Sequence, residues 1–371
     1  MRELLILFCI FILSSCTGIP VTPCVSETGN ANKVEHEGLK KIIDSYSKAN
    51  SDIGLQATVI MPDGKVLSAV SGYSDIKKKC PLTFDSLLLT GSITTLYTTT
   101  LVMKEVEEGK ISLDEKIDKW INASWSKDVT VRMLLNHTSG IASYTSSPFF
   151  LISAFMFRNR VWTTKQVLKY FITTQLLFKP GSMYKYSNSN YVLLGIILEK
   201  TTGQKFGQLL KEKLHVINAC FDCPPYSPQA NGYDRSLLHL GITDMTPYRT
   251  SFKTSAFSAG GISSTSDETA GFVHDLFSGG VLSSGALSEM VKHMEVKDKD
   301  HPCLTGYGLG IKRFKIDGED LYGHTGTLPG YSGIVVHNIN KGYTICILGN
   351  LSVIDQVELV RQVQKTITRG L

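Results

Sequence analysis

Three short blocks carry side chains that could perform acyl-transfer chemistry. In the first, Gly91-Ser92-Ile93-Thr94-Thr95, the serine opens a run with helical character. The second contains Tyr186-Ser187-Asn188 and the third His324-Thr325-Gly326. At a helix N-terminus, free backbone N–H groups and the helix dipole favour negative charge on a serine oxygen. The pattern predicts a nucleophile at Ser92, whereas an isolated serine at such a place more often only caps the helix.

The first block lacks a basic partner for its serine. Residues three apart share a helix face, so the side chain best placed to take the proton of Ser92 is that of Thr95, which has no basic nitrogen. Tyr186 is a poor base, because its ordinary pKa is about 10. A general base contributes about 10²- to 10⁴-fold to a rate, so we expect slow turnover. Lys185 could replace the missing amine, although adjacent residues usually point apart.

The third block offers an imidazole and backbone donors. With an ordinary pKa of about 6.5, His324 would be the group in the three blocks that titrates nearest neutrality. It is expected to share proton transfer with Tyr186, or else to have a structural role. The N–H groups of Ser92 and Thr327 are candidate oxyanion donors. The expected supporting residues are Asn188, Thr325, Gly326 and Thr327.

These blocks resemble the active-site elements of the serine β-lactamase and penicillin-binding protein superfamily. The segments Leu134–Gly140, Asn190–Gly195 and Ser258–Thr265 add to the resemblance, which covers about residues 40 to 370. In that superfamily the first block reads Ser-x-x-Lys, so Thr95 marks an altered catalytic position. The resemblance implies a five-stranded antiparallel sheet flanked by helices, joined to an all-helical lobe with the site between them. It also implies no metal or organic cofactor, and a D-alanyl peptide, β-lactam or small ester or amide as substrate. The histidine of the third block favours a carboxypeptidase or esterase type.

Hydrophobic periodicity predicts an α+β fold whose two β-rich ends flank a helical middle. Helices are expected near each end of the domain and after Ser92, and strands on both sides of the Pro62-Asp63-Gly64 turn. The expected helices are 38–48, 92–108, 162–170, 191–200 and 354–367, and the expected strands 55–61, 65–73, 306–314, 321–324, 331–337 and 343–348. The domain would cover 36–370, with a sheet lobe at about 36–110 and 291–370 and a helical lobe at about 111–290.

The N-terminus has the pattern of a processed leader. A ten-residue apolar stretch, Leu4–Leu13, is too short to cross a bilayer and suits a signal peptide over residues 1–15. Leu13-Ser14-Ser15-Cys16 resembles a lipobox, so Cys16 is the expected lipidation site and 16–35 a tether. The prediction is an extracytoplasmic protein held on a membrane surface by a lipid, with ordinary secretion as the alternative.

Besides Cys16, and Cys9 within the expected leader, six cysteines remain, and their even number fits an oxidising compartment. Cys220-Phe221-Asp222-Cys223 has the spacing of a disulfide, a redox motif or half a zinc site, and we favour a structural disulfide or free thiols. The formal net charge of +5 without a basic cluster excludes a nucleic-acid-binding class.

Two functions fit the pattern. One is a slow serine hydrolase acting through an acyl-enzyme at Ser92 on a small-molecule or peptide substrate of cell-wall type. The other is a pseudoenzyme of the same fold that serves as a binding or scaffold module, an alternative motivated by Thr95. A monomer is expected in both cases.

Overall fold

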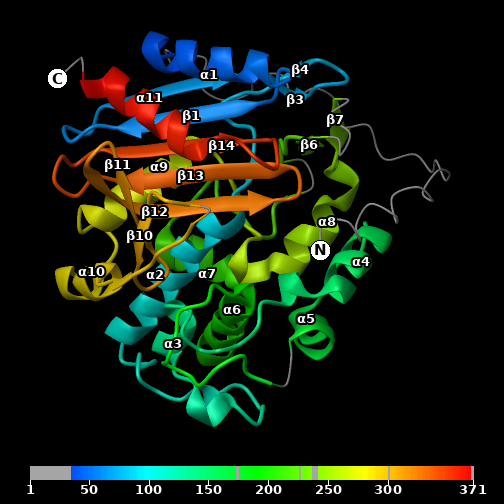
Figure 1. The fold of residues 1–371 in the computed structure, drawn as a ribbon, viewed down its shortest axis with the longest axis vertical. Coiled ribbons are helices and arrows are strands. Elements are labelled where there is room, and N and C mark those ends of the chain that lie inside the picture. Colours follow the sequence, from blue (N-terminus) through cyan, green and yellow to red (C-terminus); the bar gives the residue numbers. More distant parts are fainter. Residues whose placement is uncertain (1–34, 173–174, 225–226, 236–240, 300, 369–371) are drawn as a thin grey trace.

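Two β-rich segments from opposite ends of the chain meet in one antiparallel sheet (Figure 1). The computed structural model describes residues 35–172, 175–224, 227–235, 241–299 and 301–368. Within them eight strands follow the order β2-β1-β14-β13-β12-β11-β10-β9. Their bounds are β1 Leu55–Ile60, β2 Val66–Ser71, β9 Met294–Glu295, β10 Leu304–Tyr307, β11 Lys312–Ile316, β12 Glu319–Leu328, β13 Tyr331–His337 and β14 Thr344–Gly349. The predicted α+β class is confirmed.

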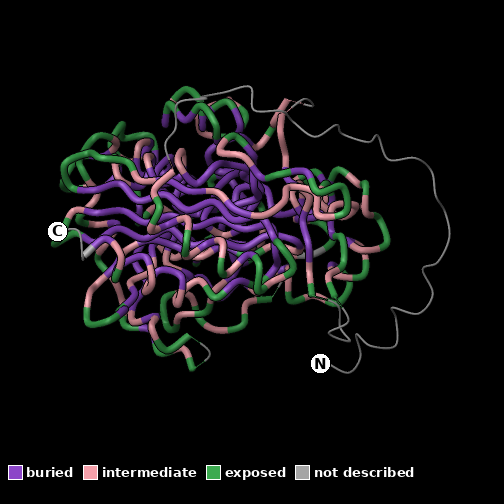
Figure 2. Tube along the Cα trace, turned by 90° about the horizontal axis from the view of Figure 1, so that it is seen from above, coloured by how far each residue is buried: buried purple, intermediate pink, exposed green. Residues whose placement is uncertain are grey.

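Both faces of the sheet are covered, because its central strands are apolar on both sides. On β14, Ile345 and Ile347 pack with the helices α1 (Glu37–Ala49) and α11 (Gln356–Thr368). The alternate residues Cys346 and Leu348 belong to the core on the opposite face. Successive strand residues point to opposite faces, so an uninterrupted apolar strand needs a layer on each side. Figure 2 shows these strands as the buried centre of the molecule.

The sheet is larger than the five strands that the resemblance implied. The strands β2, β1, β14, β13 and β12 match that number, and β11, β10 and β9 extend the sheet at one edge. The single strand expected over 306–314 is two strands, β10 and β11. Gly308 donates its N–H to the carbonyl of Ile311, and Gly310 has a φ of +65°, so the chain turns between them.

A helical lobe packs below the sheet in the view of Figure 1. Its helices are α3 Val131–Leu135, α4 Pro148–Met156, α5 Thr164–Phe171, α6 Asn188–Thr202, α7 Phe206–Leu214, α8 Arg249–Ala256 and α10 Ser284–Val291. The helix α9 (Ser266–Phe277) falls within the span expected for this lobe but packs on the sheet against β1 and β14. The Ser68 hydroxyl donates to the Asp267 carboxylate at 2.8 Å, which ties β2 to α9.

The expected leader, the Cys16 lipidation site and the tether up to residue 34 lie outside the described residues. Among the residues that the structure does describe, none of the helices has the length and apolar character needed to cross a membrane.

Candidate active site

Ser92 lies in a tight turn at the start of a buried helix, as the sequence predicts. A 3₁₀ turn over Gly91–Ile93 leads into α2 (Thr94–Glu107). A methyl group on Gly91, whose φ is +54°, would lie 2.6 Å from the Thr327 nitrogen, and one on Gly326 would lie 1.8 Å from the Thr90 carbonyl oxygen. Both glycines are therefore required for the turn to close against β12. This closure places Ser92 and the backbone of Thr327 beside each other.

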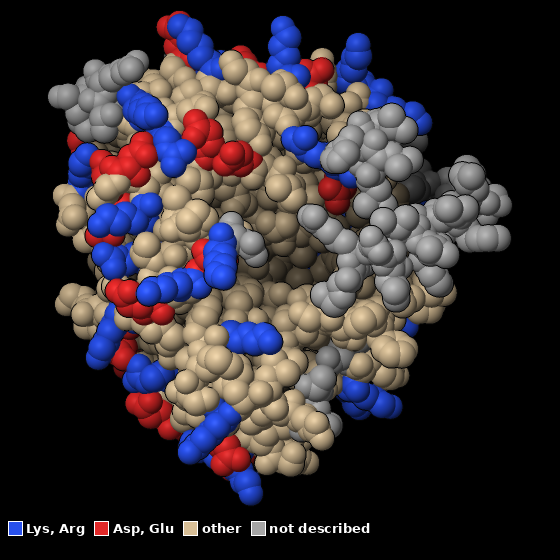
Figure 3. All heavy atoms as spheres, in the orientation of Figure 1, with Lys and Arg blue, Asp and Glu red and all other residues tan. Residues whose placement is uncertain are grey.

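A pocket of about 220 Å³ opens at this junction. Ser92, Asn188 and Thr327 contribute polar atoms to its wall, and the other lining residues are mostly apolar. These include Tyr144, Phe150, Leu151, Phe252, Ala256, Leu328 and Pro329. The molecular surface is hollowed between the two lobes on the face shown in Figure 3. The wall carries no charged side chain, so it suits an uncharged, largely apolar group.

Tyr186 lies next to Ser92 with its hydroxyl oxygen buried. That oxygen has no hydrogen-bond partner among the described residues. Burial raises the pKa of Tyr186 to about 12, and interaction with the Ser92 hydroxyl partly offsets the rise. At pH 7 the phenolate fraction is on the order of 10⁻⁵, so Tyr186 alone is a weak proton acceptor.

A chain of directed hydrogen bonds links two buried histidines through Tyr307. His324 donates from Nδ1 to the Thr325 carbonyl at 2.6 Å, because a carbonyl can only accept. Its Nε2 therefore accepts from the Tyr307 hydroxyl at 3.2 Å. That hydroxyl in turn accepts from His137 Nε2 at 3.0 Å, and the Ser187 N–H donates to His137 Nδ1 at 3.2 Å. Both ring nitrogens of His137 and of His324 therefore have a hydrogen-bond partner within the protein.

The expectation that His324 titrates near neutrality is not met. The side chain is 0% exposed, and burial together with the positive charge of Lys312 holds the pKa of His324 well below its ordinary value. The same two causes lower the pKa of His137 to about 3. Both imidazoles are neutral at pH 7. The ring nitrogens of His324 are both engaged, with Tyr307 and with the Thr325 carbonyl, which leaves neither free to accept a proton from Ser92.

The structure supplies a cation that the sequence analysis missed. Lys312 on β11 donates to the Thr325 hydroxyl at 2.6 Å and lies 5.8 Å from the centre of the Tyr186 ring. Burial lowers the pKa of Lys312 to about 8, an effect that the charge of Asp298 partly offsets. Among the groups around Tyr186 whose pKa is shifted, Lys312 titrates nearest neutrality. The register that pairs it with Gly323 brings it to the third block.

The two positions considered for a basic partner in the sequence do not provide one. Thr95 is fully buried, and its hydroxyl donates to the Ser92 carbonyl oxygen at 2.8 Å, in the turn that leads into α2. Lys185 is exposed and does not line the pocket. Asn188 lies at the start of α6, lines the pocket and donates from its amide to the Thr145 hydroxyl at 3.1 Å.

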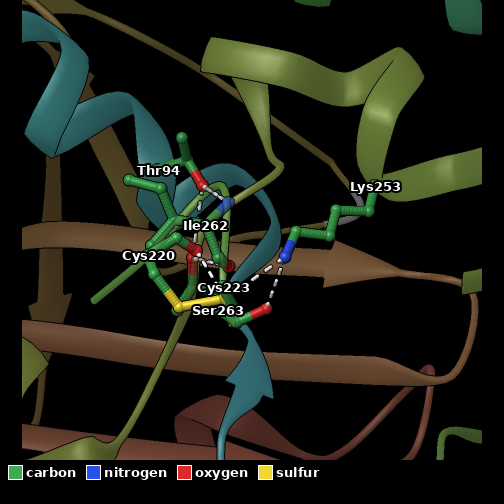
Figure 4. The surroundings of a disulfide bond; sticks show 7 residues. Thr94, Cys220, Cys223, Lys253, Ile262 and Ser263 are labelled. Atoms are coloured by element: carbon green, nitrogen blue, oxygen red, sulfur yellow. Dashed lines mark hydrogen bonds between the residues drawn. A yellow bond between two sulfur atoms is a disulfide. The ribbon is translucent and has the colours of Figure 1, made fainter. Parts of the chain in front are cut away.

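Cys220 and Cys223 form a disulfide, one of the two states favoured from the sequence. Lys253, on α8, lies 3.4 Å from the Cys223 sulfur and 3.4 Å from the Ser263 hydroxyl (Figure 4). No cluster of three or more metal-ligating side chains lies in the described ranges. The disulfide fixes a loop whose Cys220 pairs with Ser263 through two backbone hydrogen bonds.

Comparisons with known proteins identify the family. Residues 39–362 match the β-lactamase family, so the chain belongs to it. Protein flp of Staphylococcus aureus (strain COL) is 26% identical over 314 residues, which are 79% of this chain and 59% of that protein. The chain thus spans about three fifths of the length of this curated relative.

Solved structures agree with the fold. The D-amino acid amidase from Ochrobactrum anthropi SV3, complexed with L-phenylalanine amide, superposes with a TM-score of 0.81 at 23% identity, covering 90% of this chain and 98% of that one. A D-stereospecific amidohydrolase from Streptomyces sp. gives a TM-score of 0.75 at 26% identity, covering 88% and 97%. The expected relationship to β-lactamases and penicillin-binding proteins is confirmed.

Proposed function

We propose that this protein is a serine hydrolase that cleaves an amide or ester through an acyl-enzyme at Ser92. The observation that carries the proposal is the buried Tyr186 hydroxyl, which is next to Ser92 and unpartnered in the described part of the chain, with Lys312 near its ring. An unpartnered buried hydroxyl is costly, and a proton shared with the neighbouring Ser92 hydroxyl would satisfy it.

In the proposed step, Ser92 Oγ forms a bond to the carbonyl carbon and its proton passes to the Tyr186–Lys312 pair. The Ser92 and Thr327 N–H groups hold the oxyanion. The proton then goes to the leaving amine or alcohol as its bond to carbon breaks, and water later hydrolyses the acyl-enzyme. Without a lysine at position 95 the Tyr186 pKa stays at about 12, which supports slow turnover.

The pocket favours a substrate with an uncharged apolar group on the acyl or side-chain part. Phe150, Leu151 and Phe252 form apolar wall, while Asn188 and Thr327 can hold a polar backbone. The named activities of the two amidohydrolase relatives are consistent with an amide of a D-amino acid. We therefore propose small amides or esters of this kind over charged peptides.

The decisive measurement is intact mass after incubation with a fluorophosphonate and with penicillin. We expect a slow adduct that is absent from Ser92→Ala, because the hydroxyl is the attacking group. Equal labelling of wild type and Ser92→Ala would exclude Ser92 as the nucleophile.

A pseudoenzyme is the second candidate, since the Thr95 hydroxyl bonds the backbone carbonyl of Ser92 and position 95 offers no amine to the Ser92 hydroxyl. Thr95→Lys distinguishes the two. If Thr95→Lys is labelled by the fluorophosphonate about 10²- to 10⁴-fold faster than wild type, the site is intact and lacks only a general base. If neither wild type nor Thr95→Lys is labelled, the protein is a binding module.

We also propose that the protein works outside the cytoplasm, held by a lipid on Cys16. The support is the apolar stretch and the lipobox-like segment at the N-terminus. Metabolic labelling with a palmitate analogue tests it, with Cys16→Ser as the control.

A further inference from the structure

The longest acid-free part of the chain carries an apolar helix with its large side chains exposed. Residues 129–198 contain no Asp or Glu, although at the chain's average acidic content about six would be expected. The same 70 residues contain seven basic side chains. This charge asymmetry is confined to the segment that includes α4 and α5.

The helix α4 has an unusual distribution of apolar surface. Its sequence, Pro-Phe-Phe-Leu-Ile-Ser-Ala-Phe-Met, has Ser153 as its one polar residue, yet of its side chains Phe150 and Ala154 alone are fully buried. Phe149 is 77% exposed, Ile152 44% and Met156 61%. Positions separated by three and four residues share a helix face, so these three project together. Large exposed apolar side chains gathered on one face mark an interaction surface.

Further apolar and basic residues continue this surface along the chain. Phe157, Val161 and Tyr170 are also exposed. Lys165 and Lys169 on α5 are exposed, and the Arg160 guanidinium lies 4.2 Å from the centre of the Trp162 ring. Among the described residues, Arg158, Arg160, Lys165 and Lys169 form no ion pair with an acidic side chain. Figure 3 shows tan atoms and blue side chains, without red, over α4 and α5.

From this combination we propose that α4 and α5 dock onto an anionic lipid surface. Apolar side chains of one helix face enter the interface, while lysine and arginine remain at the level of the headgroups and attract their negative charge. Pairing of this surface with a second copy would bring basic residues against basic residues, which opposes a symmetric dimer. The inner face of α4 supplies Phe150 and Leu151 to the pocket, so docking would place the pocket beside the lipid. The proposal is independent of catalysis at Ser92 and of a lipid on Cys16.

The test is vesicle co-sedimentation of the chain produced from residue 17 onward, which removes the apolar leader and Cys16 and retains every described element. We expect binding to vesicles of phosphatidylcholine with phosphatidylglycerol, weaker binding to phosphatidylcholine alone, and release by salt. Phe149→Ser with Met156→Ser should lower the partition coefficient at least tenfold. Lys165→Gln with Lys169→Gln should lower it about 25-fold, since each basic residue near an anionic surface contributes about 5-fold.

Matched controls lie outside the acid-free segment. Ile217→Ser removes an apolar side chain that is 84% exposed, and Lys65→Gln with Lys77→Gln removes two exposed charges. These variants should bind like wild type, and thermal unfolding should show all variants folded. Equal binding by wild type and both α4–α5 variants, or no binding to anionic vesicles, would overturn the proposal. The proposal would also be overturned if wild type formed a dimer and the variant Phe149→Ser with Met156→Ser did not. The α4–α5 surface would then bind a second copy of the chain rather than lipid.

Discussion

At the scale of single residues, protonation is decided by burial and by one cation. Ser92, Tyr186 and His324 are brought to one region, but their proton affinities do not match a simple triad. The imidazole is neutral and fully hydrogen-bonded, and the phenol is protonated at pH 7. The remaining titratable partner is Lys312, whose pKa is about 8.

Replacing Lys312 should therefore change both the size and the pH dependence of acylation. In the proposed mechanism, Tyr186 and Lys312 together must lose one proton before Ser92 can transfer its own. The labelling rate should rise with pH, be half-maximal near pH 8 and level off above it, whichever of the two groups releases the proton. Lys312→Met should lower the rate about 10²- to 10⁴-fold and remove the inflection.

The measurement is a pH profile of fluorophosphonate labelling between pH 6 and 10, read alongside the folded fraction. Lys312→Arg keeps the charge but titrates far higher, so it should lose the inflection near pH 8. An inflection near 8 that persists in Lys312→Met would assign it to another group.

At the scale of elements, the site depends on close approach of β12 to the turn that carries Ser92. Gly326→Ala would place a methyl group 1.8 Å from the Thr90 carbonyl oxygen, and backbone on both sides leaves little room to relax. We expect a loss of stability of about 2 kcal/mol or more, together with loss of labelling at Ser92.

Gly271→Ala is the matched control, because the same added methyl group on α9 meets no atom within 4 Å. It should leave labelling unchanged and raise stability by about 0.5–1 kcal/mol. Urea unfolding of the two variants measures the difference. Unaltered labelling by Gly326→Ala would show that the turn does not need this contact.

At the scale of the whole molecule, buried neutral histidines should make the fold sensitive to mild acid. Burial lowers the pKa of His137 to about 3, that of His337 to about 4, and that of His324 well below its ordinary value. The unfolded chain binds protons at these sites below about pH 6.5, whereas the folded protein does not. The contribution of these histidines to the free energy of unfolding is therefore complete above pH 6.5, and it is lost as the pH falls toward their lowered pKa values.

The free energy of unfolding should fall with decreasing pH, with a slope of up to about 1.4 kcal/mol per pH unit for each histidine below its unfolded pKa. Urea midpoints at pH 7 and pH 5 measure it, in a range where the carboxylates stay ionised. His337→Asn should reduce the slope by about a third. A stability that is constant between pH 7 and 5 would show that these side chains become protonated without unfolding.

Much of the fold could be predicted from local patterns. Helix 38–48 is α1, and the turn at Pro62-Asp63-Gly64 joins β1 to β2, because hydrophobic period and turn residues act over a few positions. The position of Ser92 at a helix start followed for the same reason. The break between β10 and β11 was missed because the apolar run from Gly306 to Phe314 conceals a turn.

The sequence by itself determined the class of fold, the absence of an amine at position 95 and the place of Ser92, the candidate nucleophile, at a helix start. Tertiary structure decided which amine lies near Tyr186, namely Lys312 of β11. The Asp317-Gly318 turn was a local signal that could have placed Lys312 opposite Gly323, since a two-residue hairpin turn fixes the register. The nearness of Lys312 to Tyr186, and the burial that lowers the pKa of His324, depend on elements far apart in the chain. A pKa is set by all surrounding charges and by exclusion of water, so only the folded molecule specifies it.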